Sequence, residues 1–387
     1  MPSFSSAITS KLPAVGTTIF TVMSKLAQEH NAINLSQGFP DFDCAPRLLE
    51  LVAKYFNAGL NQYPPMAGVM ALRERVVEKA AALYGATYDP EHEATIVPGA
   101  TYGIFTAITA FVRPGDEVVL FEPTYDSYAP AVEVNGGRPV YVRLQYPDYS
   151  IDWNAVQQAI TPKTRMIVIN TPNNPTTSVF SAEDMRAFEN ILRNTNIIVV
   201  ADEVYEHLIY DGHQHQSVAR FPGLAERSFV VSSFGKTYHA TGWKIGYCIA
   251  PAALTSEFRK VHQFVQFSVA TPLQAAIADF LVECPQHHLE LPAFYQQKRD
   301  YFLDILAQTR LAARPAAGTY FQLADYSAIS DRPDVEFVES LTVETGVAAI
   351  PVSAFCTGAA ASERLIRFCF AKDTATLDAA GERLRKI

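Results

Sequence analysis

"FVVSSFGKTYHATGWKIGYCIA" (residues 229–250) places a lysine between two short apolar runs. The runs at 229–233 and 246–250 are apolar on both faces, which is typical of strands covered by helices on both sides of a sheet. Between them stand Lys236, hydroxyl residues and glycines, and no acidic residue lies within five positions of this lysine. The stretch therefore predicts a buried strand that delivers Lys236 to the edge of a sheet.

The same order of apolar run, turn and helical segment recurs along the chain. The other runs lie at 95–97, 117–121, 139–144, 166–170 and 197–202. This alternation predicts an α/β domain over residues 45–282, with a mainly parallel seven-stranded sheet between helices. The last three runs lie close together in the chain, which leaves room for one antiparallel strand. Apolar residues at helical spacing predict a helix over 66–84, before Gly85.

A different pattern begins near residue 283. A long amphipathic helix is expected at 291–310, strands at 318–327, 346–355 and 363–371, and a final helix at 375–387. This pattern predicts a smaller α+β domain over residues 283–387. Residues 1–44 are expected to form an N-terminal arm and part of that small domain.

Composition excludes several classes of protein. The net charge is −9 and no basic run is present, which argues against a nucleic-acid partner. No stretch approaches the ~20 apolar residues needed to span a membrane, and the N-terminus does not resemble a signal peptide. The five cysteines show no CxxC spacing, which predicts reduced thiols in a cytoplasmic protein.

Candidate site residues follow the ends of the predicted strands, where ligands of open α/β sheets bind. Gly99, Ala100 and Thr101 open a helix, and such an N-terminus suits a phosphate, although a plain helix cap is an equal alternative. Tyr125 follows the run at 117–121, and its ring either stacks on a planar ligand or belongs to the core. Asn174 offers a donor and an acceptor, or belongs to an ordinary Asn/Pro turn.

The last strand ends add ionisable groups. Asp202 closes a strongly apolar run, with Tyr205 three residues later, and an N-cap role is the alternative for this carboxylate. Ser233, Lys236 and Lys244 follow the run quoted first. A lysine among apolar residues and near other cations has a lowered pKa and becomes a nucleophile toward carbonyl groups. Pyridoxal phosphate is a ligand that suits all of these features at one edge of a sheet: a phosphate site, an aromatic ring for stacking, a carboxylate, a phenol and a lysine.

Seven motifs resemble, in the same order, those of the fold-type I, class I pyridoxal-phosphate aminotransferases. They are "LSQGFPDF" (35–42), "NQYPPMAGVMALRE" (61–74), "PGATYG" (98–103), "NTPNNPT" (170–176), "ADEVYEHL" (201–208), "SSFGKTYHATGWKIGY" (232–247) and "ERLIRFCFAK" (363–372). The resemblance covers essentially the whole chain and is nearest to the subgroup of methionine and kynurenine/glutamine aminotransferases. Many class I members carry arginine where Lys244 stands, and lysine at this position favours that subgroup.

The resemblance implies a role for each matching residue. Lys236 would bond the cofactor aldehyde and move a proton at the substrate α-carbon, and Asp202 would hold the pyridinium nitrogen. Contacts to the cofactor phosphate and ring are implied for Gly99, Ala100, Thr101, Tyr125, Asn174, Tyr205, Ser233 and Lys244. Tyr63 would reach the phosphate of the other subunit, which implies a homodimer with active sites at the interface. Arg367 would grip the substrate α-carboxylate, supported by Gly38 and Asn174.

The implied activity is transfer of an amino group from an L-amino acid to a 2-oxo acid by a ping-pong reaction. Methionine, aromatic amino acids, histidine, glutamine and kynurenine are the expected donors, because the residues implied for the side-chain pocket are aromatic: Phe20, Phe39, Tyr63, Tyr102, Phe267 and Phe321. The alternative on the same scaffold is β-elimination from cysteine S-conjugates. A regulatory ligand sensor is disfavoured, since no DNA-binding domain fits before residue 16. No metal site is expected, because the histidines at 213–215 and 286–290 lack a third partner.

Overall fold

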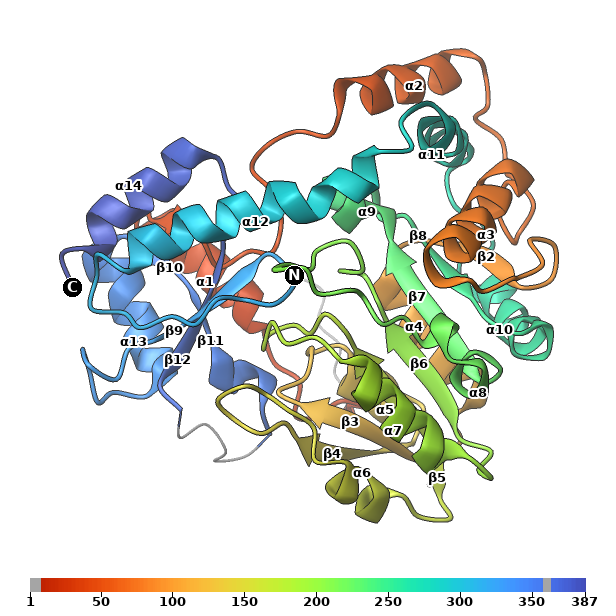
Figure 1. The fold of residues 1–387 in the computed structure, drawn as a ribbon, viewed down its shortest axis with the longest axis horizontal. Helices are drawn as coiled ribbons and strands as arrows, with labels where there is room; N and C mark the ends of the chain where they lie inside the picture. Colours follow the sequence, from red (N-terminus) through yellow and green to blue (C-terminus); the bar gives the residue numbers. More distant parts are fainter. Residues whose placement is uncertain (1–7, 358–362) are drawn as a thin grey trace.

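The computed structural model describes residues 8–357 and 363–387, and the first seven residues of the predicted N-terminal arm lie outside that part (Figure 1). Its main sheet has the strand order β2-β8-β7-β6-β5-β3-β4. The strands are β2 (Ala94–Val97), β3 (Glu117–Glu122), β4 (Arg138–Arg143), β5 (Thr164–Asn170), β6 (Ile198–Asp202), β7 (Ser228–Ser233) and β8 (Gly246–Ile249). Strand β8 runs antiparallel to both neighbours, and the other pairs are parallel. The predicted mainly parallel seven-stranded sheet is confirmed, with its antiparallel strand among the last three runs.

Both faces of the sheet are buried because successive side chains alternate between two cores. On β3, Val118 and Leu120 join one core, whereas Val119 and Phe121 join the other. Helices α4 (Ala100–Phe111) and α5 (Tyr128–Val134) contribute to the first core, and α3 (Met70–Tyr84), α7 (Ala182–Leu192) and α11 (Thr271–Glu283) contribute to the second. This two-sided burial explains why the strands read as continuous apolar runs.

The remaining helices around this sheet are α2 (Pro46–Asn57), α6 (Trp153–Ala159), α8 (Pro222–Ala225), α9 (Phe234–Thr237) and α10 (Ala252–Val265). The helix predicted from residue 66 begins only at Met70. Residues 64–67 include two prolines, and Gly68 has a φ of 101°, a left-handed value that does not continue a helix. Val69 is extended and acts as the N-cap residue.

A second, smaller group of elements contains the antiparallel sheet β11-β12-β9, built from β9 (Phe321–Asp325), β11 (Ile350–Pro351) and β12 (Leu365–Cys369). Beside it, β1 (Ile33–Asn34) pairs in parallel with β10 (Val347–Ala348), which joins the N-terminal segment to this group. Its helices are α1 (Ile19–Glu29), α12 (His287–Leu306), α13 (Asp334–Ser340) and α14 (Thr374–Leu384). Figure 1 shows the long α12 reaching from this group toward the main sheet.

The single strand expected over 346–355 is wrong. The segment divides into β10, β11 and a 3-10 turn, η4 (Val352–Phe355). Pro351 lacks an N–H for the ladder and ends the strand, and β10 and β11 pair with different partners. Across residues 8–357 and 363–387, no helix combines the length and apolar character that a membrane crossing requires.

Candidate active site

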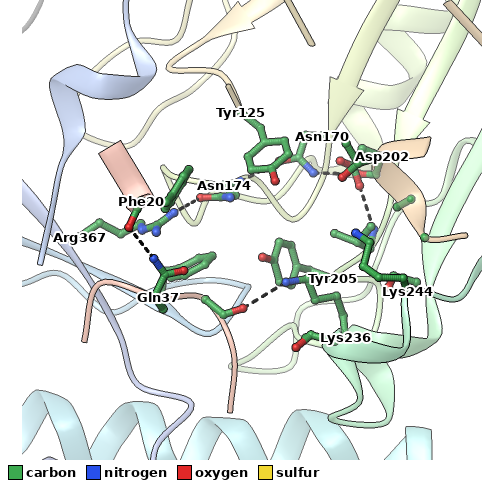
Figure 2. Close-up of a pocket in the computed structure, with 18 residues that line it drawn as sticks. Phe20, Gln37, Tyr125, Asn170, Asn174, Asp202, Tyr205, Lys236, Lys244 and Arg367 are labelled. Atoms are coloured by element: carbon green, nitrogen blue, oxygen red, sulfur yellow. Dashed lines mark hydrogen bonds between the residues drawn. The ribbon is translucent and has the colours of Figure 1, made fainter. Parts of the chain in front are cut away.

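A cavity of about 250 Å³ lies at the carboxyl ends of β5, β6 and β7, where β12 and the N-terminal segment meet the main sheet (Figure 2). Most of the residues predicted for the site line it: Phe20, Gly38, Gly99, Ala100, Thr101, Tyr125, Asn174, Asp202, Tyr205, Ser233, Lys236, Lys244, Phe321 and Arg367. The cavity also contacts Gln37, Asn170, Val204 and Thr241, which the sequence did not single out. Residues from both ends of the chain therefore meet over one sheet edge.

Asp202 is the last residue of β6, and its side chain lies at the cavity wall. Residues 204–207 form a turn instead of the helix that an N-cap role for Asp202 would require. The carboxylate accepts hydrogen bonds from Tyr128 Oη (2.5 Å) and from the Val204 N–H (3.2 Å). Burial raises the pKa of Asp202 to about 6, against the opposing effect of these donors. A cationic ligand group would stabilise this buried carboxylate.

Lys236 lies in the short helix α9, directly after β7. Its Nζ donates to Tyr320 Oη (2.7 Å) and to the Gly38 carbonyl (3.2 Å). Burial lowers the pKa of Lys236 to about 8, and the nearby cations Lys244 and Arg367 act in the same direction. A large fraction of this amine is therefore neutral, and nucleophilic, slightly above neutral pH.

One wall of the cavity is suited to a phosphate. Helix α4 begins after Gly99, and its first N–H groups have no partners within the helix. Gly99 has a φ of 88°, and a side chain there would lie about 3.3 Å from Lys244 Nζ. Lys244 itself adopts a left-handed backbone, with a φ of 51°. Such a conformation is uncommon in a non-glycine residue.

Arg367 stands in the middle of β12 with its guanidinium buried. Nη1 donates to Asn174 Oδ1 (2.5 Å) and Nη2 to the Ser36 carbonyl (3.2 Å), whereas the buried Nε has no partner within the described residues. The rings of Phe321, Phe355 and Phe20 lie 3.8, 5.1 and 5.5 Å from the guanidinium carbon. Burial lowers the pKa of Arg367 to about 10, so the group stays cationic at neutral pH. A buried cation without a carboxylate partner in the described chain suits an anionic ligand.

Four residues predicted for the site lie away from this cavity. Tyr63 is 83 % exposed, and its ring contacts that of Phe267, which is also exposed. Phe39 is exposed beside Lys372, and the Tyr102 hydroxyl contacts His262 Nδ1 at 3.0 Å. These four aromatic residues are therefore not among those that line the cavity of a single chain.

Three residues at the site carried little signal in the sequence. Tyr128 follows Tyr125 by three positions, and this spacing was the available hint. Tyr320 and Phe355 come from small-domain segments that read only as strands. Their approach to Lys236 and Arg367 depends on how the two groups of elements pack.

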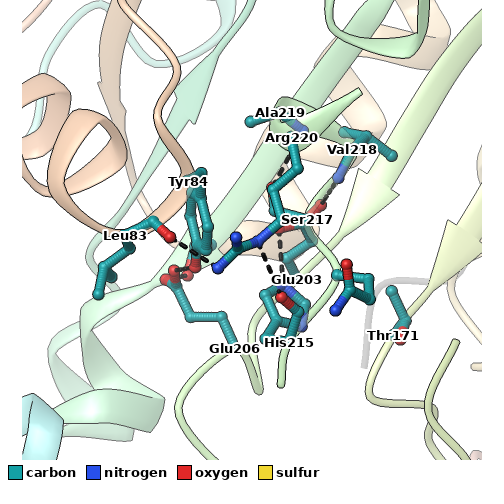
Figure 3. A network of polar contacts seen from close by, with 12 residues as sticks. Leu83, Tyr84, Thr171, Glu203, Glu206, His215, Ser217, Val218, Ala219 and Arg220 are labelled. Carbon is teal, nitrogen blue, oxygen red and sulfur yellow. Dashed lines mark hydrogen bonds and ion pairs between the residues drawn. The ribbon is translucent and has the colours of Figure 1, made fainter. Parts of the chain in front are cut away.

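The segment 202–206 is anchored on its far side by a buried polar network (Figure 3). Glu206 accepts hydrogen bonds from Lys79 Nζ (2.7 Å), Ser232 Oγ (2.6 Å), Tyr247 Oη (2.7 Å) and Tyr84 Oη. Glu203 contacts His215 Nε2 (2.9 Å) and accepts from the Val218 N–H (3.0 Å). The segment thus serves two environments: Asp202 and Tyr205 line the cavity, and Glu203 and Glu206 hold the turn.

Comparison with known proteins agrees with this geometry. Residues 30–384 match the family model "Aminotransferase class I and II". The chain is 51 % identical to a methionine aminotransferase of Escherichia coli, with 98 % of each chain covered, and 40 % identical to a probable N-succinyldiaminopimelate aminotransferase of Mycobacterium tuberculosis, with 97 % of each covered. It is 34 % identical to kynurenine–oxoglutarate transaminase 1 of Rattus norvegicus, with 97 % of each covered.

A solved structure shows the same likeness in three dimensions. The crystal structure of an E. coli protein with a methionine aminotransferase function superposes with a TM-score of 0.96 at 51 % identity, covering 98 % of this chain and 100 % of that one. Aminotransferases of this family depend on pyridoxal phosphate and act on small molecules. Sequence, fold and site thus agree: the chain is an enzyme of the class I and II aminotransferase family.

Proposed function

We propose that this enzyme moves the amino group of an L-amino acid with a thioether or aromatic side chain, methionine foremost, to a 2-oxo acid in a ping-pong reaction. One observation supports the proposal most directly. A lysine with a pKa lowered to about 8 and a buried arginine without a carboxylate partner in the described chain line the same cavity. An amine nucleophile and a carboxylate anchor are the two groups that amino-acid chemistry at the α-carbon requires.

The residues present fit pyridoxal phosphate. The open N-terminus of α4, with Ser233 and Lys244 beside it, would hold the phosphate. Asp202, whose pKa burial raises to about 6, would become fully ionised against a protonated ring nitrogen. Tyr125 would lie against the ring, and Asn174 and Tyr205 would hydrogen bond its oxygen.

Arg367 and Lys236 have separate roles in this reaction. Pyridoxal phosphate supplies an aldehyde for the amino group and a ring that withdraws electrons from the α-carbon. Arg367 binds the α-carboxylate through the N–H groups of its planar guanidinium and orients the α-carbon–hydrogen bond. Lys236 Nζ removes that proton and returns it, as a base whose lowered pKa lies near working pH.

The side-chain preference rests on the lining of the cavity. Phe20 and Phe321 contribute apolar surface, and Arg367 is the sole arginine among the described lining residues. A donor with a second carboxylate therefore finds no second guanidinium there, whereas a thioether or an aromatic ring packs against the phenylalanines. The E. coli relative named for methionine is consistent with this preference, and the aminotransferase relatives give no support to the β-lyase alternative.

We further propose a homodimer in which Tyr63 serves the partner's site. Tyr63 is 83 % exposed and its ring contacts that of the exposed Phe267, and Phe264 is 86 % exposed; exposed aromatic residues that gather in this way are typical of protein–protein interfaces. Mixing a Lys236→Ala variant with a Tyr63→Ala variant tests this arrangement, because one site of the hybrid dimer then carries both native residues. Activity above the sum of the two parents is expected, and no gain would contradict a role across the interface.

The five cysteines are unpaired, which is consistent with the predicted cytoplasmic location. Fractionation of the native source would test that location.

A donor scan tests the substrate proposal. The purified enzyme is mixed with single amino acids in the absence of an oxo acid, and the absorbance of its bound cofactor is recorded. We expect methionine and aromatic donors to convert the cofactor at least about tenfold faster than aspartate, with Lys236→Ala as the inactive background. Equal conversion by aspartate would contradict the side-chain argument. Pyruvate and a thiol released from cysteine conjugates, without conversion by methionine, would favour β-elimination.

A further inference from the structure

The hydroxyl of Tyr320 lies between Lys236 and the backbone of the N-terminal segment. Tyr320 is fully buried, and its Oη is 2.7 Å from Lys236 Nζ. The same hydroxyl donates its proton to the Gly38 carbonyl, which also accepts from Lys236 at 3.2 Å. Lys236, Tyr320 and Gly38 thus form a closed triangle of hydrogen bonds at the cavity.

The direction of these bonds follows from a count of protons. A phenol has one O–H, and that proton is committed to the Gly38 carbonyl, so toward Lys236 the oxygen can only accept. The amine of Lys236 must therefore be the donor, and it can donate both as a neutral amine and as an ammonium group.

We infer that Tyr320 is a positioning residue, whose hydroxyl accepts a hydrogen bond from the free amino group of Lys236 and holds this amine in place for proton transfer at the substrate α-carbon. The inference rests on the proposed function, in which Lys236 acts there as a free amine. It adds a small-domain residue to the machinery, because Tyr320 directly precedes β9 while Lys236 follows β7.

The surroundings of Lys236 define what removal of the hydroxyl would do. The titratable and charged groups that face its amine are Asp202, Tyr205, Lys244, Tyr320, Arg367 and Cys369. Among these, Tyr320 makes a direct hydrogen bond to Nζ. Charge-assisted hydrogen bonds are the stronger ones, so loss of this acceptor penalises the ammonium form more than the neutral amine. The pKa of Lys236 should therefore fall when only the hydroxyl is removed.

Tyr320→Phe is the test variant, and Tyr295→Phe is its matched control. Phenylalanine at 320 retains the ring, which lies 5.2 Å from that of Tyr205. Tyr295 is equally buried and its ring lies 5.9 Å from that of Tyr320, but its hydroxyl has no hydrogen-bond partner within the described residues. The two substitutions therefore remove the same atom from neighbouring rings, and only one of those atoms contacts Lys236.

The first readout is independent of turnover. The full-length, cofactor-stripped proteins are labelled with acetic anhydride across pH, and mass spectrometry quantifies the peptide that contains Lys236. The wild-type midpoint is expected near the lowered pKa of about 8. It should move down by about one pH unit in Tyr320→Phe and stay unchanged in Tyr295→Phe.

The second readout uses the cofactor-loaded enzyme. Tyr320→Phe should lower kcat about tenfold with a smaller change in KM, whereas Tyr295→Phe should leave both near wild type. If Tyr320→Phe matches the control in labelling and in kcat while Lys236→Ala is inactive, the inference about Tyr320 fails and the proposed function stands. If Lys236→Ala turns over normally, the proposed function fails first. Should Tyr320→Phe not fold, a fluorinated tyrosine at 320 retains the shape and weakens the acceptor, and an unchanged labelling midpoint would then overturn the inference.

Discussion

Replacing Arg367 by lysine should weaken catalysis through the loss of one specific donor. Lysine keeps the positive charge but cannot present two parallel N–H donors to one carboxylate, as the planar guanidinium does. A hydrogen bond to a charged group contributes about 1.5–3 kcal/mol. With a tenfold change for each 1.4 kcal/mol, kcat/KM for methionine should fall about 10- to 150-fold.

The assay compares two donors that differ only in the carboxylate. The rate of cofactor conversion is measured with methionine and with 3-(methylthio)propylamine, which has the same side chain and no carboxylate. The wild-type enzyme should strongly prefer methionine, and Arg367→Lys should lose that preference while its rate with the amine stays within about threefold of wild type.

Arg364→Lys is the matched control for this experiment. Arg364 directly precedes β12, which carries Arg367, but pairs with the exposed Asp331 at 2.7 Å. It should behave as wild type with both donors. An equal loss on methionine and on the amine in Arg367→Lys would refute the carboxylate role, and thermal melting of all variants separates this outcome from a loss of folding.

Three further predictions concern buried charges. Lys236→Ala should abolish turnover and keep non-covalently bound cofactor, which dialysis followed by absorbance would detect. Capture of added pyridoxal phosphate by the stripped enzyme should accelerate as pH rises through about 8, because the neutral amine of Lys236 is the reactive form, and a flat stopped-flow profile between pH 7 and 9 would contradict that pKa. Glu206→Gln should lower the free energy of unfolding by about 3–5 kcal/mol, because it leaves Lys79 buried without its carboxylate. The control is Glu257→Gln, at the exposed pair with Lys260, which should change this free energy by no more than about 1 kcal/mol. Urea unfolding measures both variants. Burial opposes ionisation of Glu206, but Lys79, His207 and Ser232 hold its pKa well below 4.5. The ionised carboxylate therefore stabilises the fold fully above pH 4.5. Below that pH, the difference in the free energy of unfolding between wild type and Glu206→Gln should become smaller.

The strands of the main sheet were predictable because strands that are buried on both faces have continuous apolar runs in the sequence. Each run from 95–97 to 246–250 overlaps a strand of the sheet, with limits that differ by a few residues. The helix expected from 66 starts at 70 and the strand expected over 346–355 divides, because Gly68 and Pro351 impose local backbone limits within apolar stretches. Periodicity reports burial, and it does not report where a chain must turn.

Local sequence determined which groups this site contains, because parallel strands bring their carboxyl ends to one edge. Asp202, Ser233 and Lys236 follow directly from that rule, and the family motifs add Arg367. Only the tertiary structure decided which distant residues complete the site. Tyr320 reaches Lys236, Tyr128 reaches Asp202 and Phe355 reaches Arg367 through packing between elements far apart in the chain. The same packing places the exposed Tyr63 and Phe267 outside the cavity of one chain. Contacts between distant elements depend on how whole elements pack together, and they produce no periodic pattern in the sequence.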